Sequence, residues 1–364
     1  MKWVYGILCL FFLILFHEFG HFLAALLFGV KVESFSIGFG PVLLNKNIRG
    51  TDFRLSLIPL GGYCGMKGEN DFRKALEENR KEINAEPDSL FGIHPLKRAA
   101  IGFAGPFFNF IFAVFCFILI NGIGYSYYSY SNKIILADEL YENSSTAARE
   151  AGLLSGDQII KINNKEIEDF SQIIQEVSLR PDEDLRITVL RQGQELEFTV
   201  HSELEKEDGS GKIGVAADTQ SLIERHTPDY GFFASIGHGF TDAFEYVALT
   251  FKSIGVLFKG VNLKNAVGGP ARVTDMLGTA AKDGFISLAN LIAVISISLF
   301  IMNLLPVPVL DGGLILIAII EAVSRRKVPP KVQYYVQFIG FAFIALLFII
   351  GLIGDINYFI SGAK

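Results

Sequence analysis

The chain has 364 residues, of which 51% are hydrophobic and only 19% are charged, and its formal net charge is -6. Ordinary soluble domains carry about 25% charged residues, and here the apolar residues gather in long uncharged runs, which excludes a wholly soluble enzyme and a disordered protein. The charge also lacks the basic excess that nucleic-acid binding requires. The three cysteines lie far apart in the sequence and predict neither a disulfide framework nor a thiolate zinc site.

The first apolar run extends from Trp3 to Val30, which exceeds the roughly 20 residues that a helix needs to cross a bilayer. Lys2 precedes it, as in a secretory signal peptide, but the run is too long and no clear cleavage site follows Phe16. We therefore predict a retained membrane helix.

Within this run, His17, Glu18 and His21 form an H-E-x-x-H motif. Histidines four positions apart lie on one helix face, where both can reach one zinc ion and the glutamate can hold a metal-bound water. Random shuffling gives at most about 0.01 occurrences of this motif, and ionisable groups in an apolar helix are functional candidates because their insertion is costly. A buried polar contact, as in a proton relay, is the alternative.

Two stretches after the first run, Phe35 to Leu44 and Phe53 to Glu69, are predicted to be strands with glycine turns, because apolar residues alternate in the second. A glycine-rich hairpin beside the membrane is tolerated where protein buries it or where it lines a watery cavity. A plain cytoplasmic hairpin is the alternative. The charged stretch over 71–90 is typical of a solvated helix or loop.

The second apolar run is uncharged from Ala99 to Asn132, and a small mixed domain follows over about 133–200. There AGLLSGDQIIKINN (151–164) resembles the AGLxxGDxIxxING signature of bacterial PDZ domains, with Asn164 in place of glycine; Asn tolerates the left-handed backbone of such a turn. Strands are predicted over 158–162, 185–191 and 195–201. PDZ grooves bind extended peptides by strand addition, and a purely structural spacer is the alternative.

Residues 232–262 place apolar side chains at steps of three and four, which produces one apolar helical face. Asp242, Glu245 and Lys252 interrupt the run and would lie at the bilayer centre if the helix crossed it. We therefore predict a helix on the outer membrane surface rather than a fifth span.

The third uncharged run, Phe285 to Leu310, ends in NLLPVPVLDGG, which begins at Asn303. Pro306 and Pro308 must break the helix at membrane depth, which is tolerated only around a lined cavity. Asp311 directly follows and is placed to supply a third ligand, since two histidines leave a catalytic zinc ion one protein ligand short. A helix-terminating Asp-Gly turn is the alternative.

The fourth uncharged run extends from Val332 to Gly354, so the chain is predicted to cross the membrane four times. Basic residues mark the cytoplasmic ends of membrane helices. Lys97 and Arg98 precede the second run, and several basic residues lie in the connection between the third and fourth runs. Four spans then place both termini and the segment from about 124 to 284 on the outer side.

The intramembrane HExxH together with NxxPxPxLDG resembles the site-2 protease family of intramembrane zinc metalloproteases. With one PDZ domain between the second and third spans, the chain resembles the bacterial regulator-of-sigma-E protease group. Further motifs follow in the expected order, namely FSIGFGP (35–41), IPLGGY (58–63), AGPFFNF (104–110) and GGPARV (268–273). The departures are a single PDZ domain, where some members carry two, and Leu314, where some have histidine.

Position by position, the resemblance implies that His17, His21 and Asp311 bind Zn2+ and that Glu18 is the general base and acid of an intramembrane zinc metalloendopeptidase. It implies that Asn303 takes part in catalysis by binding the substrate backbone or an oxyanion.

The resemblance also assigns roles outside the metal site. The glycine-rich hairpin would hold the substrate as an added strand, with Gly61, Gly62 and Tyr63 as substrate-binding residues. Pro106 and Asn109 would be helix-packing elements.

The implied reaction is cleavage within the transmembrane segment of single-pass membrane proteins already shortened on the outer side, such as an anti-sigma factor or a remnant signal peptide. The implied partners are these substrates, peptide segments bound by the PDZ domain, and the lipid bilayer, with no nucleic acid. The implied location is the bacterial inner membrane, with the active site inside the membrane toward the cytoplasm.

The expected fold is a polytopic α-helical membrane protein with four transmembrane helices, a membrane-associated β-hairpin and one inserted α+β PDZ domain. The expected regions are 1–123 for the first two spans and the hairpin, 124–217 for the extracytoplasmic PDZ domain, 218–284 for the surface helix, and 285–364 for the last two spans.

Two other functions stay open on the sequence alone. A membrane zincin with a cytosolic active site would place its HExxH outside an apolar span and take a glutamate from a later helix as its third ligand. A non-catalytic PDZ scaffold or a metal transporter would need no general base, which the intact Glu18 disfavours.

Overall fold

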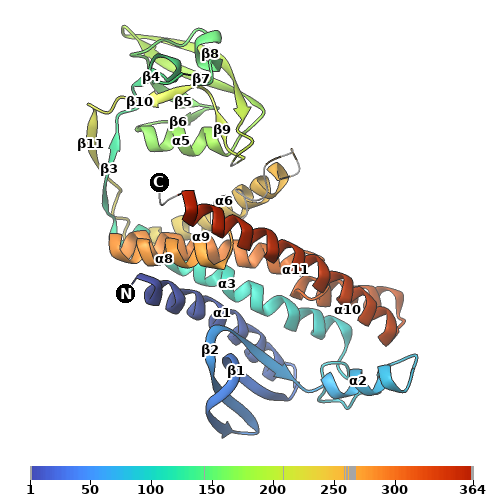
Figure 1. Cartoon of the computed structure of the whole chain (residues 1–364). Helices are drawn as coiled ribbons and strands as arrows, with labels where there is room; N and C mark the ends of the chain where they lie inside the picture. Colours follow the sequence, from blue (N-terminus) through green and yellow to red (C-terminus); the bar gives the residue numbers. More distant parts are fainter. Residues whose placement is uncertain are drawn as a thin grey trace. The chain divides into compact units, whose positions relative to one another are not determined.

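The computed structural model describes residues 2–142, 144–207, 209–257, 259, 261 and 268–361 (Figure 1). The chain divides into two compact units. Unit 1 comprises Met1–Ile120, Phe232–Val247 and Gly268–Lys364, and unit 2 comprises Asn121–Gly231 and Ala248–Val267.

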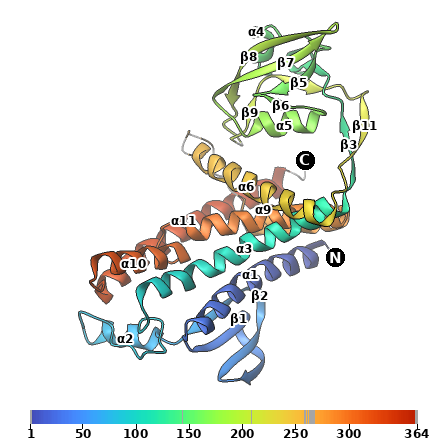
Figure 2. The same ribbon diagram turned by 180° about the vertical axis from the view of Figure 1, so that it is seen from behind.

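Four long apolar helices dominate unit 1: α1 (Lys2–Leu27), α3 (Pro95–Ile123), α9 (Phe285–Leu304) and α11 (Pro330–Ser361). Each is long and apolar enough to cross a membrane, as the four predicted spans require. Helices α1 and α3 run side by side in both views (Figures 1 and 2). A methyl group at Gly20 would lie 2.4 Å from the carbonyl oxygen of Ala104, so this glycine permits their close approach.

The third predicted span is interrupted, because α9 ends at Leu304 and a separate helix, α10 (Asp311–Ser324), follows. Pro306 and Pro308 lie in the connection, as predicted, since proline cannot donate the backbone hydrogen bond of a helix. Val309 has a φ of 95°, a left-handed backbone that is rare for a β-branched residue. The sequence does not predict α10, because its 14 residues are too few for a span.

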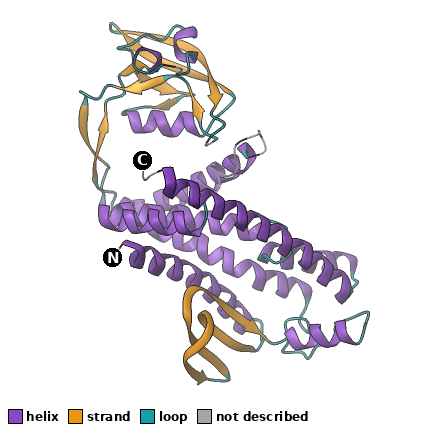
Figure 3. Ribbon diagram, in the orientation of Figure 1, coloured by secondary structure: helices purple, strands orange, loops and turns teal. Residues whose placement is uncertain are grey.

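The two predicted strands after α1 form one antiparallel hairpin, β1 (Val32–Ile48) and β2 (Thr51–Met66) (Figure 3). Arg49 and Gly50 make its two-residue turn with φ values of 53° and 87°, the handedness that suits a hairpin. The hairpin packs on α1 through Phe22, whose ring lies 5.3 Å from that of Phe35 and 5.6 Å from that of Phe53. A short helix, α2 (Glu69–Glu77), follows the hairpin.

Two further helices are α6 (Phe232–Val256) and α8 (Pro270–Asp283). The first half of α6 packs on α3, where the rings of Phe244 and Phe110 lie 5.4 Å apart. The predicted helix over 232–262 is confirmed as far as Val256, whereas residues 258, 260 and 262–267 lie outside the described part of the chain. Its location on the membrane surface stays a prediction.

Unit 2 contains a five-stranded antiparallel sheet in the order β6-β5-β7-β8-β9. Its strands are β5 (Gln158–Ile162), β6 (Lys165–Glu166), β7 (Glu183–Arg191), β8 (Gln194–Leu204) and β9 (Gly211–Lys212). Two separate pairs join β4 (Ile134–Leu136) to β10 (Val215–Ala217) and β3 (Ser126–Tyr130) to β11 (Leu222–His226). The helical segments are η1 (Ala137–Glu139), α4 (Ala147–Glu150) and α5 (Phe170–Ser178).

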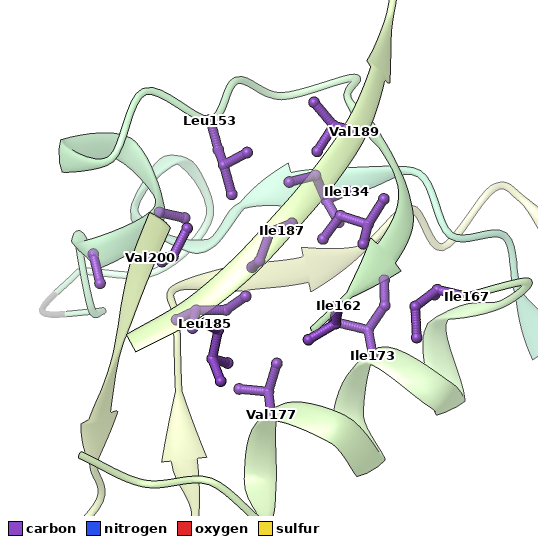
Figure 4. Packing of buried hydrophobic residues seen from close by; sticks show 14 of the residues in the cluster. Ile134, Leu153, Ile162, Ile167, Ile173, Val177, Leu185, Ile187, Val189 and Val200 are labelled. Atoms are coloured by element: carbon purple, nitrogen blue, oxygen red, sulfur yellow. The ribbon is translucent and has the colours of Figure 1, made fainter. Parts of the chain in front are cut away.

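The core of unit 2 consists mainly of aliphatic side chains, most of them from β4, β5, β7, β8 and α5 (Figure 4). Alternate residues of β7, Leu185, Ile187 and Val189, are fully buried, as the period of a strand requires. Asn163 and Asn164 form the turn after β5 with φ values of 48° and 70°. The predicted strands are confirmed. The positive φ values confirm that asparagine adopts the left-handed backbone expected at this turn.

Candidate metal centre

Helix α1 places His17 and His21 on one face, where both side chains are buried. Their Nε2 atoms lie 3.2 Å apart. Asp311, the first residue of α10, places Oδ2 3.1 Å from Nε2 of His17 and Oδ1 3.2 Å from Nε2 of His21. The structure thus brings together the three side chains that the sequence nominates as metal ligands.

The geometry of this cluster fits a zinc ion. One ligand atom from each of the three residues lies within 4.8 Å of the others. Zinc bonds of about 2.0–2.2 Å at tetrahedral angles separate neighbouring ligand atoms by about 3.4 Å, close to the 3.1–3.2 Å that separate these atoms here.

The hydrogen bonding of His21 also favours a cation. Its Nδ1 donates a hydrogen bond to the backbone carbonyl oxygen of Ile101 at 2.8 Å, so a neutral ring presents the lone pair of Nε2 toward Asp311. A lone pair that faces a carboxylate requires a cation or a proton between them. Zinc sites use this arrangement: one ring nitrogen binds the metal, and the other is held by a hydrogen bond to the protein.

Helix α3 leaves room for this cluster at Gly105. A methyl group at this position would lie only 2.2 Å from Nε2 of His21. The AGPFFNF motif contains this glycine, whose contact with His21 is not evident from the sequence. The available signal was a glycine four positions before Asn109, which places both residues on one face of α3.

Glu18 is held beside the cluster by the hairpin. Its Oε2 accepts a hydrogen bond from the backbone N–H of Cys64 in β2 at 3.0 Å. A methyl group on Gly62 would lie 3.7 Å from Cγ of Glu18, so this glycine lies next to the glutamate. The carboxylate is therefore oriented by the backbone of β2 and is separate from the three clustered ligand atoms.

A cavity of about 240 Å³ opens beside these residues. Its lining comes from α1, α3, α9, α10 and the connection after α9: Ile14, His17, Glu18, Asn109, Leu299, Asn303, Val309, Leu310 and Asp311. A water molecule occupies about 30 Å³ in the liquid, so the cavity has room for a metal-bound water and a substrate group. Asn303, nominated from the sequence, lines the cavity together with the metal cluster.

The three nominated substrate-binding residues differ in their surroundings. Gly62 lies beside Glu18, as described above. Gly61 has a φ of 125°, and a methyl group there would lie 2.2 Å from the ring of Phe39. The ring of Tyr63 stacks on Phe39 at 6.3 Å, and its hydroxyl accepts a hydrogen bond from Arg54 at 3.3 Å.

Asn109 has a larger role than helix packing. Its backbone carbonyl accepts a hydrogen bond from Ser296 of α9 at 2.8 Å, which is a packing contact. Its side-chain amide, however, lies 3.2 Å from Nδ1 of His17. Sequence reasoning missed this contact, because it joins two different helices.

The buried His-His-Asp cluster, the adjacent glutamate and the apolar helices that carry them define a membrane-embedded zinc metalloprotease. The sequence matches peptidase family M50 over residues 5–347, and the chain belongs to that family. The predicted protease class and the zinc cofactor are thereby confirmed.

Relatives named as zinc metalloproteases match nearly the whole chain. One from Treponema pallidum (strain Nichols) is 34% identical over 446 aligned residues, which cover 98% of this chain and 99% of that protein. One from Campylobacter jejuni is 38% identical over 368 residues, covering 98% and 93%. One from Helicobacter pylori is 33% identical over 365 residues, covering 97% and 99%.

Proposed function

We propose that this protein cleaves a peptide bond within the transmembrane segment of single-pass membrane proteins. The observation that carries the proposal is the location of the metal cluster. His17 and His21 lie inside α1, a helix long and apolar enough to cross a membrane, and the cavity beside them is lined by further apolar helices. A membrane zincin with a cytosolic active site would have its HExxH outside such a helix.

In this mechanism His17, His21 and Asp311 would hold the zinc ion. When bound, zinc lowers the pKa of its water to about 7 and polarises the scissile carbonyl group. Glu18, oriented by the N–H of Cys64, accepts the proton of the water and passes it to the leaving amine. Asn303 lines the same cavity and donates from its amide to the substrate backbone or to the developing oxyanion.

The β1–β2 hairpin presents the substrate to this site. A helical substrate hides its peptide bonds, so it must unwind before cleavage, and strand addition to the hairpin compensates the lost backbone hydrogen bonds. Support comes from Gly62 and Cys64, which bring β2 directly beside Glu18. Gly61, Gly62 and Tyr63 would contact the added strand.

Unit 2 contains, in this proposal, a PDZ domain over 124–217, which places the protein in the regulator-of-sigma-E protease group. A cavity of about 460 Å³ lies along α5 and the segment 211–215, with Phe170, Ile173 and Val177 of α5 in its lining. Strand β10 belongs to a two-stranded pair with β4, so its second edge is unpaired among the described residues. Such an edge beside an apolar helix suits an extended peptide.

The proposed location is the bacterial inner membrane, with both termini and the PDZ domain on the extracytoplasmic side and the active site toward the cytoplasm. Support comes from the basic connection between α10 and α11, which contains Arg325, Arg326 and Lys327. The substrates are membrane proteins already trimmed on the outer side, such as an anti-sigma factor or a remnant signal peptide. The PDZ domain and the surface helix of region 218–284 would exclude untrimmed proteins by size.

The test uses purified full-length protein and a tagged single-pass substrate whose outer domain has been removed. We expect the wild type to cut within the apolar segment, as mapped by mass spectrometry, and Glu18→Gln to cut nothing while it retains zinc. Glu33→Gln, at an exposed glutamate of β1, is the matched control and should cleave normally. Cleavage by Glu18→Gln at the wild-type rate contradicts the assigned base, and zinc-bound wild type that cuts neither of two unrelated substrates favours a transporter or a scaffold.

A further inference from the structure

Asn109 carries an unexplained buried amide next to the metal cluster. Asn109 is fully buried in α3, and its Oδ1 has no hydrogen-bond partner among the residues that the structure describes. Buried polar atoms without partners are rare in native proteins and usually have a specific reason.

His17 and His21 differ at the ring nitrogen that faces away from Asp311. In His21 that nitrogen donates to the carbonyl oxygen of Ile101, so in the neutral ring Nε2 carries no proton and can bind a metal. In His17 the corresponding Nδ1 faces the amide of Asn109 at 3.2 Å. The nitrogen and oxygen of an amide are assigned from their hydrogen bonds, so either end of Asn109 can occupy this position.

The two orientations have opposite consequences for His17. If the NH2 group of Asn109 donates to Nδ1, the neutral ring carries its proton on Nε2, the atom that faces Asp311, and cannot bind a metal there. If Oδ1 faces Nδ1 instead, Nδ1 keeps the proton and donates it, and Nε2 has a free lone pair. One end of the amide lacks a partner in both cases, so the requirement for a metal-binding Nε2 decides between them.

We propose that Asn109 is a positioning residue of the metal centre, whose Oδ1 accepts a hydrogen bond from Nδ1–H of His17 and thereby fixes the tautomer and orientation of this ligand. The proposal rests on the zinc assignment made under the proposed function and extends it to a second layer of contacts. Such contacts orient metal-binding histidines and raise their basicity.

The test compares three variants by their zinc dissociation constants, measured by competition with a chromophoric chelator in the absence of substrate. Asn109→Leu has a similar size and no acceptor, and it should bind zinc about 10- to 100-fold more weakly. Asn109→Asp retains an acceptor and should bind zinc about as tightly as the wild type. Ser296→Ala removes the contact to the Asn109 backbone and leaves the amide in place, so its zinc affinity should not change.

A second readout is the visible absorption spectrum of the Co2+-substituted protein, which reports ligand geometry. Asn109→Leu should change this spectrum, whereas Ser296→Ala should not. Wild-type affinity and spectrum in folded Asn109→Leu, or an equal loss of affinity in the leucine and aspartate variants, overturns the proposal.

If the leucine variant does not fold, a measurement on the wild-type protein still tests the proposal. In a long-range proton–nitrogen NMR spectrum of zinc-bound protein with labelled histidine, His17 must carry a proton on Nδ1, and this proton must be shifted downfield, as in a hydrogen bond to Oδ1 of Asn109. A proton on Nε2 overturns the proposal. Because no substrate is involved, a protein that binds zinc through His17 in this way but cleaves nothing refutes the proteolysis and not the role of Asn109.

Discussion

The two units differ in how much of their apolar side-chain surface is exposed. In unit 2 the interior is aliphatic, with Ile159, Leu185 and Val200 fully buried. In unit 1 the spanning window of α11 is only 11% buried, and Phe338 of this helix is 63% exposed. Both units also bury polar residues, which include Asp157, Asp169 and Glu176 in unit 2. In unit 1 they include His17, His21, Arg98, Asn109, Ser296 and Glu321.

This difference follows from the solvent that each unit is built for. Lipid tails are as apolar as leucine, so membrane helices gain little by burying apolar side chains against one another and associate through close packing and polar contacts. In unit 1, a buried polar residue therefore indicates a helix–helix contact or a functional site more clearly than a buried aliphatic residue does. In unit 1, His17, His21, Asn109 and Ser296 lie at or next to the metal cluster, and Arg98 pairs with Glu321.

The most direct effect on the site concerns close packing around the metal ligands. Gly105→Ala would place a methyl group 2.2 Å from Nε2 of His21, which must displace the ring and should reduce zinc affinity and peptidase activity at least about tenfold. Gly237→Ala in α6 is the control, because a methyl group there meets nothing within 4 Å and alanine favours a helix. Normal zinc binding by Gly105→Ala would contradict the described approach of α3 to His21.

The next effect concerns buried charge. Arg98 of α3 and Glu321 of α10 form an ion pair with both side chains about 95% buried (5% and 4% exposed) and a separation of 2.5 Å. Arg98→Met leaves the carboxylate buried without its partner and should cost about 3–5 kcal/mol of unfolding free energy, measured by thermal unfolding in detergent.

Unit 2 offers the matched exposed pair for this experiment. The side chain of Arg149, which pairs with Asp138, is 47% exposed, so Arg149→Met should cost about 0–1 kcal/mol. Similar losses in the two variants would show that the buried pair of unit 1 contributes no more than a surface contact.

A smaller effect tests the apolar side of the comparison. Ile187→Ala in the core of unit 2 should cost about 2–5 kcal/mol, visible as faster hydrogen exchange of the amides of β7 and β8 in the full-length protein. Phe338→Ala in α11 should change stability little, because this side chain contacts lipid in both the folded and the unfolded states. An equal effect of the two substitutions would contradict the claim that apolar burial stabilises unit 2 more than the lipid-facing surface of unit 1.

The parts of the structure that depend on local periodicity could be predicted from the sequence. Helical spacing puts His17 and His21 on one face, and the end of an uncharged run points to Asp311. Contacts between separate elements could not be predicted in this way. The amide of Asn109 meets a residue 92 positions away, and Cys64 meets one 46 positions away, because hydrophobic spacing shows which face is apolar but not which faces meet.

The central claim is that His17, His21 and Asp311 together hold one zinc ion inside the membrane. The most direct measurement is the zinc content of purified wild type and Asp311→Ala by mass spectrometry of the metal. Asp283→Ala, at an exposed position at the end of α8, is the control. We predict one zinc per chain in the wild type and the control, and loss of zinc from Asp311→Ala. Full occupancy in Asp311→Ala would contradict the ligand assignment.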